Sequence, residues 1–561
     1  MGNKNLNLDV DTCVKEKLNE IEKHDGDILD SVLNHVGDLG RYQKLLFIAM
    51  LPLGFTYAFA YFVQLFIAVT PQNHWCRVPE LANLSMELRR NLSAPGAITG
   101  KWDHCMTFDT NWTQVLDTLK PPAVGTPMVP CQHGWEFEFN DIPYETVTSE
   151  REWVCDNAKN VPTAASMFFV GSVVGGVIFG WMADRFGRVP AVIATNLIGG
   201  IGGVATTFTT GVWDFILCRF LVGLSFDNCF MMLYIMVLEY VGPQYRTLVA
   251  NLILALSFGV ASVAMPWMAY FIADWRILVW VTSLPMFLVL LAPWVIPESI
   301  RWLMSRGRIN EAIAILEKFE RINGTKIPEH VMDEFVIVSN KGKMEEKQNF
   351  FCIFKSPPLR KAMFSLMILF MGGALVFDGL VRLSDSLGMN FFVVFTFIEV
   401  SELISILVVA VILDRFGRRK VCVGPMYASS VFLLVALFLP KGVPQTVIEI
   451  AARFFTNTCF TCVMQWTTEI LPTPFRATGC SILHMCAFIS TVFTPFIVYS
   501  GRYWSMLPIL IFTLMTFLTA SVGLTLPETR GLPMPQTIAD GEKNIREQSL
   551  CGKPERDDLD V

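Results

Sequence analysis

The sequence predicts an all-α membrane protein whose twelve transmembrane helices form two parallel six-helix halves. Three observations lead to this fold class. Of the 561 residues, 53% are hydrophobic and only 17% are charged, whereas soluble domains are about 25% charged. The apolar residues come in long runs, and about 20 of them are enough to cross a bilayer. A set of short motifs recurs at one constant spacing, which indicates duplication of a six-helix unit.

The composition also excludes several classes of protein. So much apolar surface could not be hidden in one soluble core of this length, which argues against a soluble enzyme. The net charge is −6 and the pI is about 5.8, so no nucleic-acid partner is expected. No Gly-x-x-x-x-Gly-Lys-Ser/Thr motif, metal cluster or nucleophile constellation occurs in the sequence. We therefore expect no enzyme activity, catalytic residue, metal or cofactor.

Twelve apolar runs are long enough to be spans. In chain order they lie at 44–69, 163–183, 190–211, 214–238, 247–272, 277–296, 362–383, 390–413, 421–440, 446–470, 478–500 and 504–526. The polar segments between and around them are predicted as an N-terminal segment (1–43, without a removable signal peptide), a central loop (299–361) and a C-terminal tail (528–561), so that the halves are 44–298 and 362–527. Apolar residues at helical spacing over 309–319 predict a short helix that stops at Gly324.

The segment 71–160 is predicted to be a large extracellular loop between spans 1 and 2. It contains three glycosylation sequons, at Asn83, Asn91 and Asn111. Its four cysteines suggest two disulfides in an oxidising compartment, and three pairings are open: Cys76, Cys105, Cys131 and Cys155. The short loops on the other side carry the basic residues, so both termini are expected in the cytoplasm and the protein in the plasma membrane.

One motif recurs at an offset of 230 residues. Asp184-Arg185-Phe186-Gly187-Arg188 is repeated as Asp414-Arg415-Phe416-Gly417-Arg418. At the same offset Glu239 matches Glu469, Arg246 matches Arg476 and Pro297-Glu298-Ser299 matches Pro527-Glu528-Thr529. Parallel halves with a site between them at mid-membrane are an arrangement found in transporters.

The repeated charges lie at the cytoplasmic ends of spans. An acid at one helix end can bridge to an arginine of the neighbouring turn and hold that face closed, and the alternative is a static brace. We assign gating or structural roles to Asp184, Arg185, Arg188, Arg219, Glu239, Arg246, Asp414, Arg415, Arg418, Arg453, Glu469 and Arg476.

Several motifs resemble those of a known family. The loop from Gly180 to Arg188 resembles the signature loop of the major facilitator superfamily, and Arg219 to Gly223 resembles its fourth-span motif. More specific strings are similar to the organic cation/anion/zwitterion transporter family, including invertebrate carriers of carnitine-like compounds, carcinine and β-alanine. These strings are Gly40-Arg41-Tyr42-Gln43, Pro297-Glu298-Ser299-Ile300-Arg301-Trp302-Leu303, Thr468-Glu469-Ile470-Leu471-Pro472-Thr473 and Leu526-Pro527-Glu528-Thr529-Arg530-Gly531.

Ionisable residues inside the spans are functional candidates, because a charge at mid-bilayer is costly. The acids are Asp227, Asp378, Glu399 and Glu402, and the cationic or titratable residues are Arg219, Arg453 and His484. Structural pairing is the alternative for each: Asp378 with Arg382 four residues on, or Glu402 with Arg453. Asp227 lies too far along its helix from Arg219 for direct contact.

The resemblance implies which residues face the ligand. Cation carriers of the family have an acid at the position of Glu402, and this chain keeps it, whereas Phe488 stands where cation carriers have an acid and anion carriers an arginine. Asp227 stands where cation carriers have a lysine. The substrate-binding residues implied in this way or by their charge are Glu402, Asp378, Asp227, Phe230, Phe377, Phe460 and Phe488, with Tyr57 and Tyr61 as weaker candidates. Aromatic faces attract ammonium groups.

The excess of acids at mid-membrane predicts a carrier of small organic cations or zwitterions that works by alternating access. Its partners would be the amine-bearing solute and the lipid bilayer. Two alternatives remain open. The first is an organic anion carrier that uses Arg453 and Arg219. The second is a non-transporting receptor built on a carrier scaffold, for which the large outer loop is the supporting feature.

Overall fold

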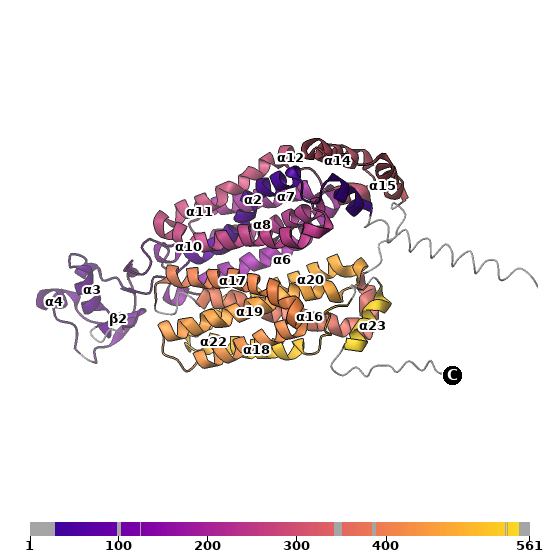
Figure 1. Cartoon of the computed structure of the whole chain (residues 1–561). Coiled ribbons are helices and arrows are strands. Elements are labelled where there is room, and N and C mark those ends of the chain that lie inside the picture. The colour runs from indigo at the N-terminus through magenta and orange to yellow at the C-terminus, as the bar shows by residue number, and fades with distance from the viewer. Residues whose placement is uncertain are drawn as a thin grey trace, which may run out of the picture.

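The computed structural model describes residues 28–97, 102–123, 125–341, 350–383, 389–532, 535 and 537–548. Two bundles of long helices lie side by side, with a small domain at one end (Figure 1). We call residues 68–159 the loop domain and the end that carries it the loop end. The opposite end, where α14 (Ile309–Asn323), α15 (Glu329–Lys341) and α23 (Ile538–Gln548) lie, is the tail end.

The first bundle, the N lobe, holds six apolar spans. They are α2 (Arg41–Ile67), α6 (Asn160–Phe186), α7 (Arg188–Thr206), α8 (Val212–Tyr240), the pair α9 (Arg246–Leu254) and α10 (Val260–Ile272), and the run of α11 (Trp275–Ser283) and α12 (Ala292–Val295). A π-helical turn at Ala255–Gly259 connects the two helices of the fifth span. A 3₁₀ segment at Leu284–Leu291 connects the two helices of the sixth. The 3₁₀ segment begins beside Pro285, which lacks the N–H that an α-helix needs.

The second bundle, the C lobe, repeats this pattern. Its spans are α16 (Pro357–Arg382), α17 (Phe391–Phe416), α18 (Arg418–Ala436), α19 (Val443–Ile470), the pair α20 (Thr473–Thr491) and α21 (Thr494–Tyr499), and α22 (Leu507–Gly523). Among the described residues, eleven helices are long and apolar enough to cross a membrane, and the shorter apolar helix Leu507–Gly523 makes the twelfth span. The predicted all-α, twelve-helix fold is confirmed.

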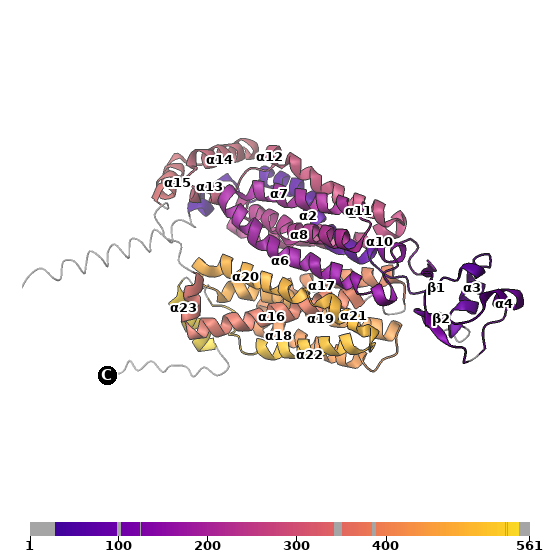
Figure 2. The same cartoon turned by 180° about the vertical axis from the view of Figure 1, so that it is seen from behind.

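The lobes converge toward the loop domain and diverge toward the tail end (Figure 2). Within the N lobe, α6 and α8 approach so closely that their backbones touch. A Cβ atom at Gly175 would lie 2.0 Å from the Leu224 carbonyl oxygen, and one at Gly223 would lie 2.0 Å from the Phe168 carbonyl oxygen. Gly171 and Gly175 form a G-x-x-x-G pair on α6 that allows this contact, as in many membrane helix pairs.

The segment between the lobes begins with three helices at the tail end. They are α13 (Ile300–Ser305), α14 and α15. The helix predicted at 309–319 extends to Asn323 and ends at Gly324, whose φ of 72° is the left-handed conformation that glycine tolerates. The apolar side chains of α14 pack into the N-lobe core, where Leu316 and Phe319 are fully buried.

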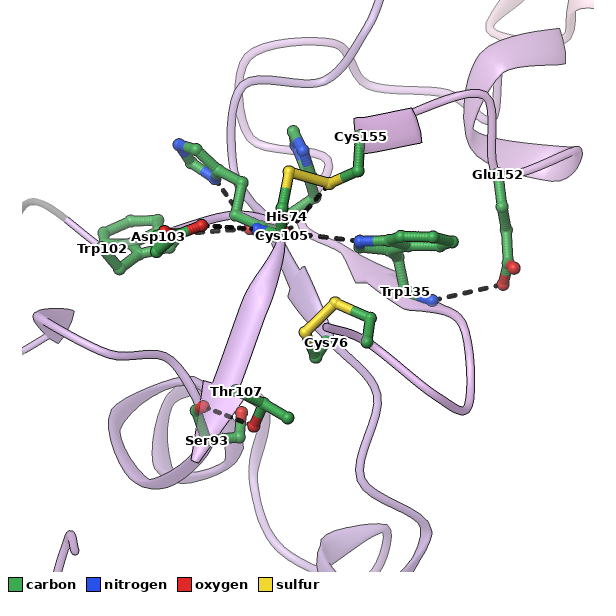
Figure 3. The surroundings of a disulfide bond; sticks show 12 residues. His74, Cys76, Ser93, Trp102, Asp103, Cys105, Thr107, Trp135, Glu152 and Cys155 are labelled. Carbon is green, nitrogen blue, oxygen red and sulfur yellow. Dashed lines mark hydrogen bonds between the residues drawn. A yellow bond between two sulfur atoms is a disulfide. The ribbon is translucent and has the colours of Figure 1, made fainter. Parts of the chain in front are cut away.

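The loop domain is held by two short antiparallel sheets and two disulfides. Strands β1 (His74–Cys76) and β4 (Trp135–Phe137) pair, as do β2 (Met106–Phe108) and β3 (Met128–Pro130), and the helices α3 (Met86–Ser93), α4 (Trp112–Thr118) and α5 (Val147–Glu150) complete the domain. The disulfides are Cys76–Cys131 and Cys105–Cys155, so one of the three open pairings is selected. Figure 3 shows Cys105 and Cys155 joined beside His74 and Trp135.

At the tail end, the repeated glycines turn the chain between neighbouring spans. Gly187 and Gly417 have φ values of 112° and 85° with extended ψ, a conformation nearly restricted to glycine. Glu298 accepts the backbone N–H of Arg188 at 2.8 Å, and Glu528 accepts that of Arg418 at 2.9 Å. Each carboxylate therefore stabilises the positive end of a helix dipole at the same place in each lobe.

The side-chain pairs around these turns differ between the lobes. In the C lobe Arg418 binds Glu469 at 2.8 Å across two spans, as the bridging hypothesis expects. In the N lobe Arg188 binds Asp184 of its own turn at 2.9 Å, and among the described residues no ion pair joins it to Glu239. The expected symmetric bridge is therefore absent from the N lobe.

Other repeated charges have local partners. Arg246 binds Asp30, which also binds Arg301 at 3.1 Å. These ion pairs attach the segment before α2 to the tail end of the N lobe. Arg185 lies over the Trp181 ring, 5.7 Å from its centroid. Arg415 is exposed and Arg476 is half-buried, while the side chain of Asp414 lies outside the described part of the structure.

We predict that Gly417→Ala lowers the thermal unfolding midpoint in detergent. The new Cβ atom would lie 2.7 Å from Glu528, and a non-glycine residue in this conformation costs about 1–3 kcal/mol. Gly424→Ala is the matched control, because Gly424 lies inside α18 with no atom within 4 Å of the added Cβ. Equal midpoints for the two variants would contradict the role of the turn.

We predict that the loop domain loses stability below pH 6.5. Burial, reinforced by the neighbouring His104, lowers the pKa of His74 from 6.5 to about 4. The unfolded chain binds the proton more readily, so the stability associated with neutral His74 is full above pH 6.5 and falls as the pH drops toward 4, by about 3 kcal/mol. The thermal midpoint of His74→Asn, whose amide can still donate a hydrogen bond, should fall less over this range. His133→Asn, which removes an exposed histidine of the same domain, should behave like the parent.

Candidate functional site

Buried charges gather where the lobes face each other. The helices that supply them are α8 of the N lobe and α16, α17, α19 and α20 of the C lobe, and α2 of the N lobe adds the Tyr61 hydroxyl. Figure 1 shows α17 and α20 of the C lobe on the side that faces the N lobe. The contacts between α10 and α17 and between α6 and α20 join the lobes. The charged residues predicted from the sequence therefore lie at or next to the interface.

Arg453 of α19 is the centre of one cluster. Its guanidinium is fully buried, with Nη2 2.9 Å from Glu402 Oε2 and 3.7 Å from Glu399 Oε1. Nη1 donates to the Phe377 carbonyl oxygen, and the guanidinium carbon lies 3.8 Å from the centroid of the Phe377 ring. Asn457, one turn further on, donates to the Glu402 carbonyl oxygen at 3.3 Å. One arginine thus serves two carboxylates on consecutive turns of α17.

The Glu399 carboxylate has fewer hydrogen-bond partners than that of Glu402. Its side chain has no exposed surface, and neither of its oxygens accepts a hydrogen bond from any of the described residues. The Ser262 hydroxyl of α10, which borders α17, donates to Gly259 of its own helix at 3.0 Å. Buried carboxylates normally accept several hydrogen bonds, so Glu399 can accept donors beyond those that the described residues supply.

Asp378 of α16 belongs to a second cluster, which bridges the lobes. Its Oδ2 atom lies 2.8 Å from Arg382 Nε, one turn further along α16. Its Oδ1 atom accepts a hydrogen bond of 2.5 Å from the hydroxyl of Tyr61 on α2. We call this interaction of Tyr61, Asp378 and Arg382 the loop-end latch. Pairing with Arg382 was one of the two interpretations of Asp378 from the sequence, but the bond to Tyr61 was not expected.

A third polar contact joins Asp227 of α8 to His484 of α20. The His484 Nδ1 atom lies 3.4 Å from Asp227 Oδ2. The other carboxylate oxygen of Asp227 is buried and has no hydrogen-bond partner among the described residues. Asp227 therefore contacts the opposite lobe rather than Arg219 of its own helix, in agreement with the distance argument.

Aromatic rings fill the space between these clusters. The Tyr57 ring stacks between those of Phe226 and Phe230, with both centroids at 4.8 Å. Phe226 also contacts Phe488 of the C lobe at 5.7 Å, and Phe488 in turn lies 5.2 Å from the ring of His484. In the C lobe, the rings of Phe377 and Phe460 stack at 6.0 Å. The predicted aromatic residues thus form two groups, and Phe488 and His484 link the first group across the interface.

Arg219 of α8 is separate from these clusters. It is 1% exposed and donates to the Thr206 hydroxyl, and its guanidinium carbon lies 5.6 Å from the centroid of the Phe215 ring. No carboxylate of the described residues lies within 4 Å of it. It borders a cavity of about 480 Å³ at the loop end, which we call the loop-end cavity. Residues of both lobes and of the loop domain line this cavity, including Gln64, His74, Trp153, Arg382 and Arg502.

Comparison with known proteins places the chain in a family. Residues 128–537 match the family described as Sugar (and other) transporter. The chain belongs to this family. It is 30% identical to the carcinine transporter of Drosophila melanogaster over 546 residues, which are 93% of this chain and 81% of that protein. It is 31% identical to solute carrier family 22 member 1 of Bos taurus over 532 residues, 92% of each chain.

Other similarities agree with this assignment. The beta-alanine transporter of Drosophila melanogaster is 30% identical over 553 residues, which cover 93% of this chain and 90% of that protein. Among solved structures, the inward-open xylose transporter XylE from E. coli superposes with a TM-score of 0.56 at 16% identity, covering 89% of this chain and 98% of the other. The last similarity concerns the fold alone. The predicted family and the prediction of a transporter rather than an enzyme are confirmed.

The sequence did not predict several residues that shape the interface of this transporter. Phe226 and Gln64 lie on apolar spans without a motif, and the importance of Tyr61 depends on Asp378, which is 317 residues away in the chain. Gln64 could have been noticed as a lone amide three residues before the end of an apolar helix. Phe226 carries no signal that distinguishes it from a core residue in a chain with 44 phenylalanines.

We predict that Arg453→Met strongly destabilises the transporter, because it leaves Glu399 and Glu402 buried together without a cation. Breaking a buried pair from one side costs about 3–5 kcal/mol. The measurement is the thermal unfolding midpoint of the purified protein. Adding Glu399→Gln and Glu402→Gln to Arg453→Met should restore most of the lost midpoint. If the triple variant were as unstable as the single one, the arginine would act through packing rather than charge.

Proposed function

We propose that this transporter moves small organic solutes that carry a positively charged amine, either cations or zwitterions, by alternating access. One observation carries the proposal: Glu399 and Glu402 share a single buried arginine. One guanidinium can balance only one of the two carboxyl groups, so acidic groups outnumber basic ones in this cluster, and Glu399 accepts no hydrogen bond from the described residues. An ammonium group supplies both the missing charge and the missing donors.

Two further contacts support the same charge preference. Asp227 faces His484 across the interface, and its second carboxylate oxygen has no hydrogen-bond partner among the described residues. The stacked rings of Tyr57, Phe226 and Phe230 offer faces that attract an ammonium group. Phe377 is less suitable than the sequence suggests, because the Arg453 guanidinium already covers its ring at 3.8 Å. The amine is therefore expected on the side of Glu399 and Tyr57.

The transport cycle would act on the contacts between the lobes. The loop-end latch joins α2 to α16, and the Asp227–His484 contact joins α8 to α20. Opening of the loop end requires the latch to break. We assign a gating role to the latch, in place of the direct ligand role expected for Asp378. The tail-end pairs lie within single lobes and brace their turns.

The relatives and the loop domain support a location in the plasma membrane and an orientation within it. Carcinine and beta-alanine transporters are among the relatives at 30% identity. We propose that the loop end faces outward from the plasma membrane and that both termini are cytoplasmic. Asn83 and Asn111 are exposed, as glycan acceptors need to be. Asn91 is a poorer acceptor, because its sequon hydroxyl at Ser93 is buried and donates to Arg89.

We predict that Glu402→Gln reduces amine uptake at least about tenfold, the effect of losing a buried charge-assisted contact. The variant should still fold, since Arg453 keeps Glu399 as its counter-charge. The measurement is uptake of radiolabelled quaternary amine, carnitine, carcinine, β-alanine and an aromatic carboxylate in cells that express the full chain. Surface expression is measured in parallel.

Glu449→Gln is the matched control. Glu449 is buried one turn from Arg453 on α19, but its carboxylate accepts from Gln445 at 2.8 Å. This variant should transport amines like the parent. Uptake of the carboxylate alone, unaffected by Glu402→Gln, would contradict the proposal and favour an anion carrier. A chain that reaches the surface and moves none of these solutes would favour a receptor.

A further inference from the structure

The loop-end cavity is lined by cationic side chains and by no carboxylate of the described residues. Its volume of about 480 Å³ suits a small organic molecule. Arg219, Arg382, Lys441 and Arg502 line it together with mainly apolar groups. Arg382 is balanced by Asp378 in the loop-end latch, while Lys441 and Arg502 are exposed to solvent. The unbalanced buried cation at the cavity wall is therefore Arg219.

The environment of Arg219 lacks an anion. Its Nη2 atom donates to the Thr206 hydroxyl, whereas Nε and Nη1 have no hydrogen-bond partner in the part of the chain that the structure describes. A buried arginine without a counter-charge is costly within a membrane protein. The N–H groups of Nε and Nη1 can each donate a charge-assisted hydrogen bond to an anion such as a carboxylate.

Gln64 provides a second, independent observation at the same cavity. It lies near the loop end of α2, is 5% exposed, and lines the cavity. Both its amide nitrogen and its amide oxygen are buried without partners among the described residues. Buried side-chain amides nearly always form hydrogen bonds. Two unsatisfied polar side chains from two helices therefore border one cavity, and both can donate to an anion.

We propose that the loop-end cavity binds the carboxylate of a small organic molecule through Arg219 and Gln64. The apolar part of the molecule would rest against lining side chains such as Trp153 and Phe215. The unpaired nitrogens of Arg219 are covered in this conformation, and the Phe215 ring lies 5.6 Å from the guanidinium. Binding through these nitrogens would require a local movement that exposes them. The proposal goes beyond amine transport and holds independently of it, because the amine is assigned to Glu399 and Glu402.

The test is equilibrium binding of radiolabelled benzoate to the purified full chain in nanodiscs, in sulfate buffer. Benzylamine, which has the same ring and the opposite charge, is the competitor. We expect benzoate to bind the parent, unlabelled benzoate to displace it, and benzylamine to compete at least about tenfold more weakly. Arg219→Gln should weaken benzoate binding at least about tenfold, as expected for the loss of a charge-assisted pair.

Two further variants make the test decisive. Gln64→Glu keeps Arg219, places an acid in the cavity wall and should also weaken benzoate binding at least about tenfold, so it serves if Arg219→Gln does not fold. Arg276→Gln removes an exposed loop-end arginine that pairs with Glu150 and does not line the cavity, and it should bind like the parent. Equal loss in Arg276→Gln would overturn the assignment.

Two other results would also overturn the proposal. One is benzoate binding that is absent in the parent or unchanged in Arg219→Gln and Gln64→Glu. The other is Arg219-dependent binding of chloride, measured in a separate arm, without binding of benzoate. Since uptake of amines is measured in cells and depends on Glu402, failure of that proposal would be seen separately from failure of this one.

Discussion

The arrangement of this transporter depends on the need of each buried charge for an opposite charge or a hydrogen-bond partner. The membrane core and the lobe interface have a low dielectric, so an unpaired ion there is costly. Arg453 satisfies this need for Glu402 by direct contact and for Glu399 only partly. Asp378 satisfies it with one residue of its own helix and one of the other lobe. The positions of the partners therefore decide which contacts stay within a lobe and which join the two lobes.

The duplicated halves use one backbone design and different side-chain pairs. Glu298 and Glu528 cap equivalent helix starts after glycines of the same unusual conformation. Backbone capping survives divergence because every helix start has N–H groups to satisfy. Ion pairs are freer to change: Arg418 bridges two spans in the C lobe, while its counterpart Arg188 stays within its own turn. The two lobes therefore present different constraints to a conformational change.

The sequence predicted what depends on local pattern. Apolar runs gave the spans, and four-residue spacing on a helix gave the pair of Asp378 and Arg382. It could not choose among disulfide pairings, because the correct choice depends on how β1 and β2 are placed by the folded loop domain. Nor could it find the bond between Tyr61 and Asp378 or the contact of Asp227 with His484, since both join residues of different lobes. The chemistry of the interface is a property of the packing.

Groups of opposite charge lie in different parts of the interface. Acidic groups outnumber arginines around Glu399, whereas Arg219 borders the loop-end cavity with no carboxylate of the described residues within 4 Å. The loop-end latch lies between them in the network, because Arg382 borders the cavity and Asp378 holds Tyr61. A carboxylate bound at Arg219 would reduce the net positive charge of the cavity wall that Arg219 shares with Arg382. Because Asp378 is already bound to Arg382 and Tyr61, it is less available to an amine than Glu399, which accepts no hydrogen bond from the described residues. The two proposed sites would therefore accept groups of opposite charge, each independently of the other.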